Sequence, residues 1–214
     1  MQMKLNQIYV NPTLTSRQQD LVRGAVRLLD REGLDGFTMR SLAAEIGLSP
    51  MAAYKHFENQ RELQLELWSS CMMTLTEETM HALETITEPG EAFIMQCTVF
   101  VQWAAAHPYR FELVFNHPFI REVRKEQATY NVRYGLWELG QKNIRGAQAS
   151  GSFRSDHAPT VLAMFAHSVM QGLAYNLVSD RVRMTSKLEQ DDAIRTTMAF
   201  LRESLSGRIP LPAA

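Results

Sequence analysis

Apolar residues recur along most of this chain at the spacing of one face of an α-helix, and no stretch alternates as a strand does. Glycines, prolines and capping residues divide the pattern into about nine segments. These segments predict an all-α protein with helices near residues 16–32, 38–46, 49–57, 60–86, 89–106, 109–115, 130–146, 159–178 and 187–205.

Residues up to about Pro12 show no periodicity and are expected to form an arm. Phe57 is expected to close the third segment as an apolar plug. Helix caps are expected at Thr15, Asn59, Asp156 and Ser186, besides those described below.

The two shortest segments carry the densest local signals. Thr38 and Ser49 each stand where an N-cap hydroxyl accepts an orphan backbone N–H. Pro50 follows at the first helical position, where its missing N–H costs nothing. Gly47 lies between the segments and can take the positive φ that ends a helix. Two capped helices around a glycine turn indicate a helix-turn-helix, although an ordinary helical hairpin inside a bundle has similar spacing.

The second short helix carries side chains suited to duplex DNA. Its first positions are small enough for close approach to base edges in a major groove about 12 Å wide. Tyr54, Lys55 and His56 follow, and their polar groups can reach phosphate oxygens.

The run FTMRSLAAEIGLSPMAAYKHFENQREL, residues 37–63, resembles the DNA-binding signature of the TetR family of bacterial transcriptional regulators. The matching residues are Thr38, the pair Leu42-Ala43, the turn Gly47-Leu48-Ser49, the residues Tyr54 to Phe57, and Leu63. The resemblance implies an N-terminal three-helix DNA-binding domain, residues 1–62, and a C-terminal helical regulatory and dimerisation domain, residues 63–214. Two positions depart from the family pattern: Ala53 replaces a larger aliphatic residue, and Gln60 replaces a phosphate-binding lysine that has Arg61 beside it here.

From the helix-turn-helix we expect a defined set of DNA contacts. Phosphates are assigned to Thr38, Tyr54, Lys55 and His56, and base edges to Arg40, Pro50, Met51 and Ala52. The helix-start residues Ser41, Ser49 and Arg61 complete the expected set.

Charge limits how such a domain binds. The whole chain carries a net charge of −1, and its first 62 residues hold eight basic and seven acidic side chains. A nearly neutral DNA-binding domain (residues 1–62, called the head below) cannot rely on bulk attraction to DNA. A second copy is therefore needed for useful affinity. We expect a homodimer in which the last two long helices of each copy form a four-helix bundle. The alternative is that these two helices pack only within one chain.

Aromatic and methionine side chains in the predicted body suggest a pocket for a small, largely apolar effector, although a plain hydrophobic core would use the same residues. His167 and Gln171 lie one helical turn apart on an otherwise apolar helix. The predicted ligand residues are Phe100, Trp103, Phe111, Phe115, Tyr134, Trp137, His167 and Gln171.

These features together predict a repressor that binds a palindromic operator as a homodimer and is released by its effector. The alternative is a helical small-molecule-binding or interaction module that has lost DNA reading. We expect no enzyme, cofactor or metal, because no phosphate loop, nucleophile elbow or metal-ligand motif occurs. Cys71 and Cys97 lack CxxC spacing and are expected to be reduced. No secretory leader is recognised and no apolar run approaches bilayer length, so we expect a cytoplasmic protein without membrane contact.

Overall fold

The computed structural model describes residues 8–57, 59–116, 130–179 and 186–207, without the side chains of residues 53, 54, 60 and 130–134. Every regular element among these described residues is helical, which confirms the predicted all-α class. Contacts divide the chain into two compact units: residues 1–76 with 107–133, and residues 77–106 with 134–214. The predicted functional boundary between residues 62 and 63 is a separate matter and stays a prediction.

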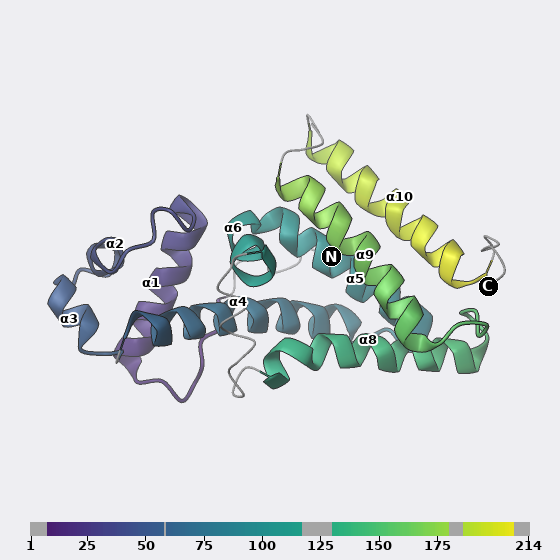
Figure 1. Cartoon of the computed structure of the whole chain (residues 1–214), viewed down its shortest axis with the longest axis horizontal. Coiled ribbons are helices and arrows are strands. Elements are labelled where there is room, and N and C mark those ends of the chain that lie inside the picture. The colour runs from purple at the N-terminus through teal and green to yellow at the C-terminus, as the bar shows by residue number, and fades with distance from the viewer. Residues whose placement is uncertain (1–7, 58, 117–129, 180–185, 208–214) are drawn as a thin grey trace. The chain divides into compact units, whose positions relative to one another are not determined.

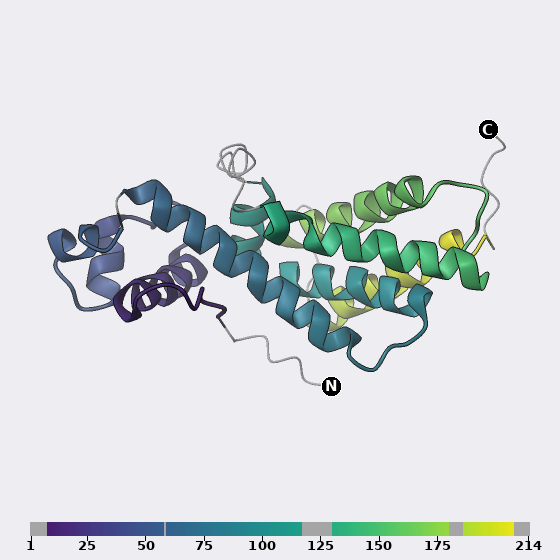
Figure 2. The same cartoon turned by 90° about the horizontal axis from the view of Figure 1, so that it is seen from below.

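The first unit begins with three helices, α1 Ser16–Glu32, α2 Met39–Glu45 and α3 Pro50–Tyr54. Figure 2 shows them clustered around the N-terminal end of the long helix α4, Gln60–Leu83. A complete capping box at Thr15 opens α1, and Asn59 Oδ1 accepts the Glu62 backbone N–H at the start of α4. The caps expected from the sequence are therefore present at both of these helix starts.

The segment before α1 is held more firmly than its lack of periodicity suggested. The backbone N–H of Tyr9 donates to Thr74 Oγ1 on α4 over 3.2 Å, and the Ser70 hydroxyl donates to the Tyr9 carbonyl. Residues 8–11 thus lie against α4. The expectation of a free N-terminal arm up to Pro12 was wrong for this part of it.

Helix α6, Pro108–Phe111, and the π-helical turn η1, Glu112–Asn116, also belong to the first unit. A plain short helix was expected over residues 109–115, and the π-turn is the difference. Trp68 on α4 donates its indole N–H to the Val114 carbonyl over 3.4 Å, so η1 is anchored to α4 within this unit.

The second unit packs α5 Pro89–Ala106, α8 Tyr130–Ser150, α9 Pro159–Val178 and α10 Lys187–Leu205. Figure 1 shows α9 and α10 side by side, and both also contact α5. Helix α5 is apolar nearly all round, and ten of its residues are buried. It forms the centre of this unit.

Two expectations about α9 were wrong. Its N-cap is Ala158 without a side-chain hydrogen bond, whereas Asp156, the expected cap, forms a bidentate ion pair with Arg154. By length and mean hydropathy α9 reaches the threshold for a membrane-spanning helix, although no apolar run was expected to do so. Only 22% of that stretch is fully buried within the chain, and several of its apolar side chains are exposed.

Candidate nucleic-acid interface

The N-terminus of α2 is built around a reciprocal cap. Thr38 Oγ1 accepts the Ser41 backbone N–H over 3.0 Å, and Ser41 Oγ accepts the Thr38 N–H over 2.9 Å. The Ser41 hydroxyl also lies 2.8 Å from the Gly36 carbonyl, to which it can donate. Ser41 is therefore committed to holding the turn before α2, while Thr38 and Arg40 beside it are exposed.

The turn between α2 and α3 follows the predicted glycine. Gly47 has φ +69°, and the Leu48 N–H donates to the Ala43 carbonyl over 2.8 Å, which satisfies an orphan carbonyl at the end of α2. Ser49 Oγ then accepts the Ala52 N–H over 3.2 Å and caps α3, with Pro50 at its first position. Both cap predictions are confirmed by this geometry.

Helix α3 presents most of its described side chains outward. Pro50, Met51 and Lys55 are exposed, and Met51 keeps 75% of its surface. Ala52 and His56 are half-buried, and Arg61 is exposed at the start of α4. The Tyr54 side chain lies outside the described residues. These exposed positions leave the outward face of α3 accessible to another molecule.

Two contacts fix α2 and α3 against α1. The Gln18 side-chain amide donates to the His56 carbonyl over 2.8 Å. A Cβ placed on Gly24 would lie 2.4 Å from Ile46 Cγ2, so α1 and α2 approach as closely as glycine permits. Beneath them Phe57 is 3% exposed, as the predicted apolar plug.

Most arginines of α1 are already paired. Arg27 Nε and Arg31 Nη1 donate to the two Glu45 carboxylate oxygens over 3.2 and 2.9 Å. Hydrogen bonds from Arg31 and then Arg27 hold the pKa of Glu45 below its usual value. By contrast, Arg40 and Lys55 form no ion pair with any other residue that the structure describes. These two cations lie on the elements predicted to meet DNA.

Sequence reasoning did not single out Arg110, which is 3% exposed and forms a bidentate pair with Asp30 on α1. The signal that marks it is a single arginine inside the apolar stretch of residues 108–115, PYRFELVF. A buried guanidinium in such a stretch needs a carboxylate partner, and only the fold shows which one.

The structure distributes the predicted ligand residues over both units. Phe111 and Phe115 lie in the first, with ring centroids 5.3 Å apart. The second unit holds Phe100 and Trp103, which are buried on α5, together with Trp137, His167 and Gln171. The Tyr134 side chain lies outside the described residues. One shared pocket for all eight residues therefore stays a prediction.

Three of these residues form a polar-aromatic group in the second unit. The Trp137 and His167 rings meet edge to face, 6.1 Å between centroids and 89° between planes. His167 keeps solvent access at one edge, yet the protein around the ring desolvates it and lowers its pKa below 6.5. One turn further, Gln171 Oε1 is buried without a hydrogen-bond partner among the described residues. Such an unsatisfied carbonyl favours any ligand that brings a donor.

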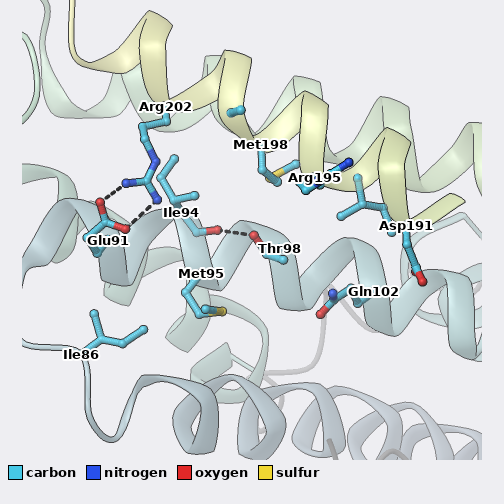
Figure 3. Close-up of a pocket in the computed structure, with 12 residues that line it drawn as sticks. Ile86, Glu91, Ile94, Met95, Thr98, Gln102, Asp191, Arg195, Met198 and Arg202 are labelled. Atoms are coloured by element: carbon cyan, nitrogen blue, oxygen red, sulfur yellow. Dashed lines mark hydrogen bonds and ion pairs between the residues drawn. The ribbon is translucent and has the colours of Figure 1, made fainter. Parts of the chain in front are cut away.

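A separate groove of about 320 Å³ lies between α5 and α10 (Figure 3). Glu91 and Arg202 form an ion pair across it, and Met95, Thr98 and Met198 are among the residues that line it. None of the predicted ligand residues with a described side chain lines this groove. Its two facing ion-pair charges balance, so it has no clear charge preference for a ligand.

Comparison with known proteins also identifies a TetR-type DNA-binding region in the head. Residues 21–67 match the model described as bacterial regulatory proteins, tetR family. The transcriptional repressor AcnR of Corynebacterium diphtheriae is 24% identical over 178 residues, which are 79% of this chain and 85% of that protein.

Solved structures share the fold over nearly the whole chain. A protein from Rhodococcus sp. RHA1 superposes with a TM-score of 0.75 at 21% identity, over 91% of this chain and 98% of that one. A TetR family transcription regulator from Marinobacter aquaeolei VT8 gives a TM-score of 0.66 at 13% identity, over 88% and 95%. The helix-turn-helix region of this chain thus matches the tetR family model, and its all-α architecture is shared with solved TetR family regulators.

Proposed function

We propose that this protein is a repressor that binds a palindromic operator as a homodimer and is released by a small, largely apolar effector. Residues 1–62 would read DNA, and residues 63–214 would bind the effector and the second copy. The observation that carries the proposal is the exposed α2–α3 pair, capped at both helix starts. Beside it stand Arg40 and Lys55, two cations that form no ion pair with the described residues. Such a regulator works in the cytoplasm, where the operator is.

The assigned DNA contacts are consistent with this exposure. Lys55 and His56 would bind phosphates at the end of α3, and Pro50, Met51 and Ala52 would face base edges. Arg61, exposed at the start of α4, would take the phosphate contact that the family assigns to the position of Gln60. Ser41 and Ser49 would act mainly by holding the helix starts, because their hydroxyls already serve the backbone.

The dimer is supported by uncovered apolar side chains on the last two helices. On α9, Val161, Met164 and Phe165 are exposed, and Tyr175 lies further along the same helix. On α10, Leu188 and Phe200 are exposed. Exposed apolar side chains on two neighbouring helices are unfavourable in water, and pairing two helices from each copy would cover them.

The effector site is assigned to the polar-aromatic group of Trp137, His167 and Gln171. The aromatic pair supplies apolar contact area, and the unsatisfied Gln171 carbonyl would accept a hydrogen bond from the effector. Effector binding would favour one arrangement of the heads over the other only through a difference in affinity for the two.

A selection experiment tests the DNA-reading part. Purified full-length protein is incubated with a random pool of duplexes, and the bound fraction is sequenced over several rounds. We expect enrichment of an inverted repeat, and loss of enrichment when Arg40 and Met51 are both replaced by alanine. Lys142→Ala, an exposed cation on α8, is the matched control and should enrich the same repeat. A pool that never enriches would instead support the alternative, a helical module that has lost DNA reading.

A further inference from the structure

The short segment α6–η1 belongs by its contacts to the same compact unit as the DNA-reading head. Sequence reasoning had placed these residues in the body. Within this unit η1 is anchored to α4 by the Trp68–Val114 hydrogen bond, and α6 contacts α1. π-helical turns are rare and are often found at functional sites.

The contact between α6 and α1 is made by a partly buried charge pair. Arg110 Nε donates to Asp30 Oδ1 over 2.7 Å, and Nη2 donates to Oδ2 over 2.6 Å. The Arg110 side chain is almost completely buried, whereas the Asp30 side chain retains about a third of its surface. A bidentate pair in this setting fixes both distance and angle between the two helices.

Tyr109 adds a second contact at the end of α1. Gly33, the C-cap of α1, has φ +69°, and a Cβ placed on it would lie 2.9 Å from the Tyr109 ring. The ring therefore covers the point where the chain leaves α1 and turns toward α2. Residues 109 and 110 together hold the last turn of α1, Asp30 included.

The far side of the same turn is bonded to α2. Arg31, next to Asp30, donates to Glu45 at the end of α2 over 2.9 Å, and Arg27 reinforces that link. Arg110 is thus connected to α2 through its bond to Asp30, the adjacent residue Arg31, and the Arg31–Glu45 bond. Coupling between distant sites needs a contiguous network of this kind, and a direct test of coupling besides.

We propose that the Arg110–Asp30 pair is the positioning contact through which α6–η1 sets the orientation of α1 and α2 on DNA. The inference rests on the proposed function, because it concerns how that same DNA-binding surface is regulated. Coupling is reciprocal, so operator binding must in turn stabilise α6–η1. That consequence can be measured without knowing the effector.

The experiment is amide hydrogen exchange on the full-length protein, with and without a duplex taken from the enriched pool. In the wild type, we expect the amides of residues 109–116 to exchange more slowly when the duplex is bound. In Asp30→Asn, which keeps the side-chain volume but removes the charge, this slowing should shrink by about fivefold or more, at saturating duplex.

The matched control is Asp156→Asn. The Arg154–Asp156 pair has the same two distances, 2.7 and 2.6 Å, but lies in the second unit. In this control, duplex binding should slow amide exchange at residues 109–116 as much as it does in the wild type. Thermal unfolding of each variant reports any loss of stability separately. If Asp30→Asn does not fold, Arg110→Lys, which keeps the charge but not the bidentate fork, makes the same comparison.

Two results would overturn the inference while leaving the proposed function intact. One is a wild type that binds its duplex without any slowing at residues 109–116. The other is a folded Asp30→Asn variant in which duplex binding slows amide exchange at residues 109–116 as much as in the wild type. The Arg110–Asp30 pair would then be purely structural. A protein that enriches no duplex at all would remove the proposed function, and this inference with it.

Discussion

If the head binds DNA as proposed, Lys55 and Arg40 should contribute more of the affinity than its nearly neutral net charge suggests. Arg27 and Arg31 are neutralised by Glu45, and Arg17 and Arg23 lie within 3.8 Å of Asp20. Because acidic residues engage these arginines on α1, the net charge conceals a surface whose free cations concentrate near α2 and α3. The number of phosphate contacts should therefore be small.

The first prediction concerns Lys55→Ala. Loss of one phosphate contact per head should weaken binding to all duplexes alike and lower the slope of log affinity against log salt by about one per half-site. Fluorescence anisotropy over a salt series measures both quantities, with Lys142→Ala as the control. A variant that loses sequence preference but keeps the wild-type slope would show that Lys55 reads bases instead.

His167 gives a prediction about pH. Desolvation keeps its pKa in the folded protein below 6.5, so the unfolded chain binds more protons than the folded one in the window below that value. Stability should then fall as the pH drops from 7.5 to 5.5, and fall less in His167→Gln. Urea unfolding at several pH values tests this, and NMR titration of the imidazole gives the pKa directly. A folded-state pKa at or above 6.5 would contradict the assigned environment.

At the scale of elements, helix starts were the features best predicted from the sequence. A cap depends on residues only three positions apart, so local sequence is enough to predict it. The structure has the predicted caps at Thr15, Thr38, Ser49, Asn59 and Ser186. Asp156 failed as a cap because Arg154 offered it a stronger, charged partner. Helix α4 was expected to run to about residue 86 and ends at Leu83.

The path of α6–η1 could not be predicted in the same way. Its decisive contact joins Arg110 to Asp30, which lies 80 residues earlier in the chain. Local pattern indicates only that the segment is helical and apolar. The π-turn and the assignment of the segment to the first compact unit both depend on tertiary packing.

The caps of α1 and α2 allow a paired prediction. Thr15→Ala and Thr38→Ala each remove an N-cap and should each lower the free energy of unfolding by about 1 kcal/mol. Only Thr38→Ala should also weaken operator binding, because Thr38 stands exposed at the predicted DNA surface. Urea unfolding and anisotropy are measured on both variants. Equal losses of DNA affinity in the two would mean that stability alone, and not the position of Thr38, sets binding.

At the scale of the whole molecule, the exposed apolar stripe of α9 predicts the oligomeric state. Met164→Glu places a charge where 61% of the side-chain surface is uncovered in the single chain. The fold should survive, while the dimer should dissociate at concentrations where the wild type stays dimeric. Light scattering coupled to size exclusion measures the mass. Arg145→Glu, an exposed change on α8, is the control, and a dimeric Met164→Glu would place the interface elsewhere.

The two predicted sites differ in how far the sequence could specify them. The residues proposed to face DNA all lie between residues 38 and 61, so a local motif and its caps are enough to assign them to α2, α3 and the start of α4. The ligand residues come from several helices and fall into both compact units. Periodicity shows that Phe111 and Trp103 are buried, but it cannot show which residues they are buried beside.

The central claim is that two α3 helices of one dimer enter successive major grooves of an operator. Hydroxyl-radical footprinting of the wild type on its enriched duplex tests this most directly. We predict two equal protected half-sites related by inversion, with centres about 34–36 Å apart or a multiple of that spacing. A single protected site, bound with full affinity by the monomeric Met164→Glu variant, would contradict the account.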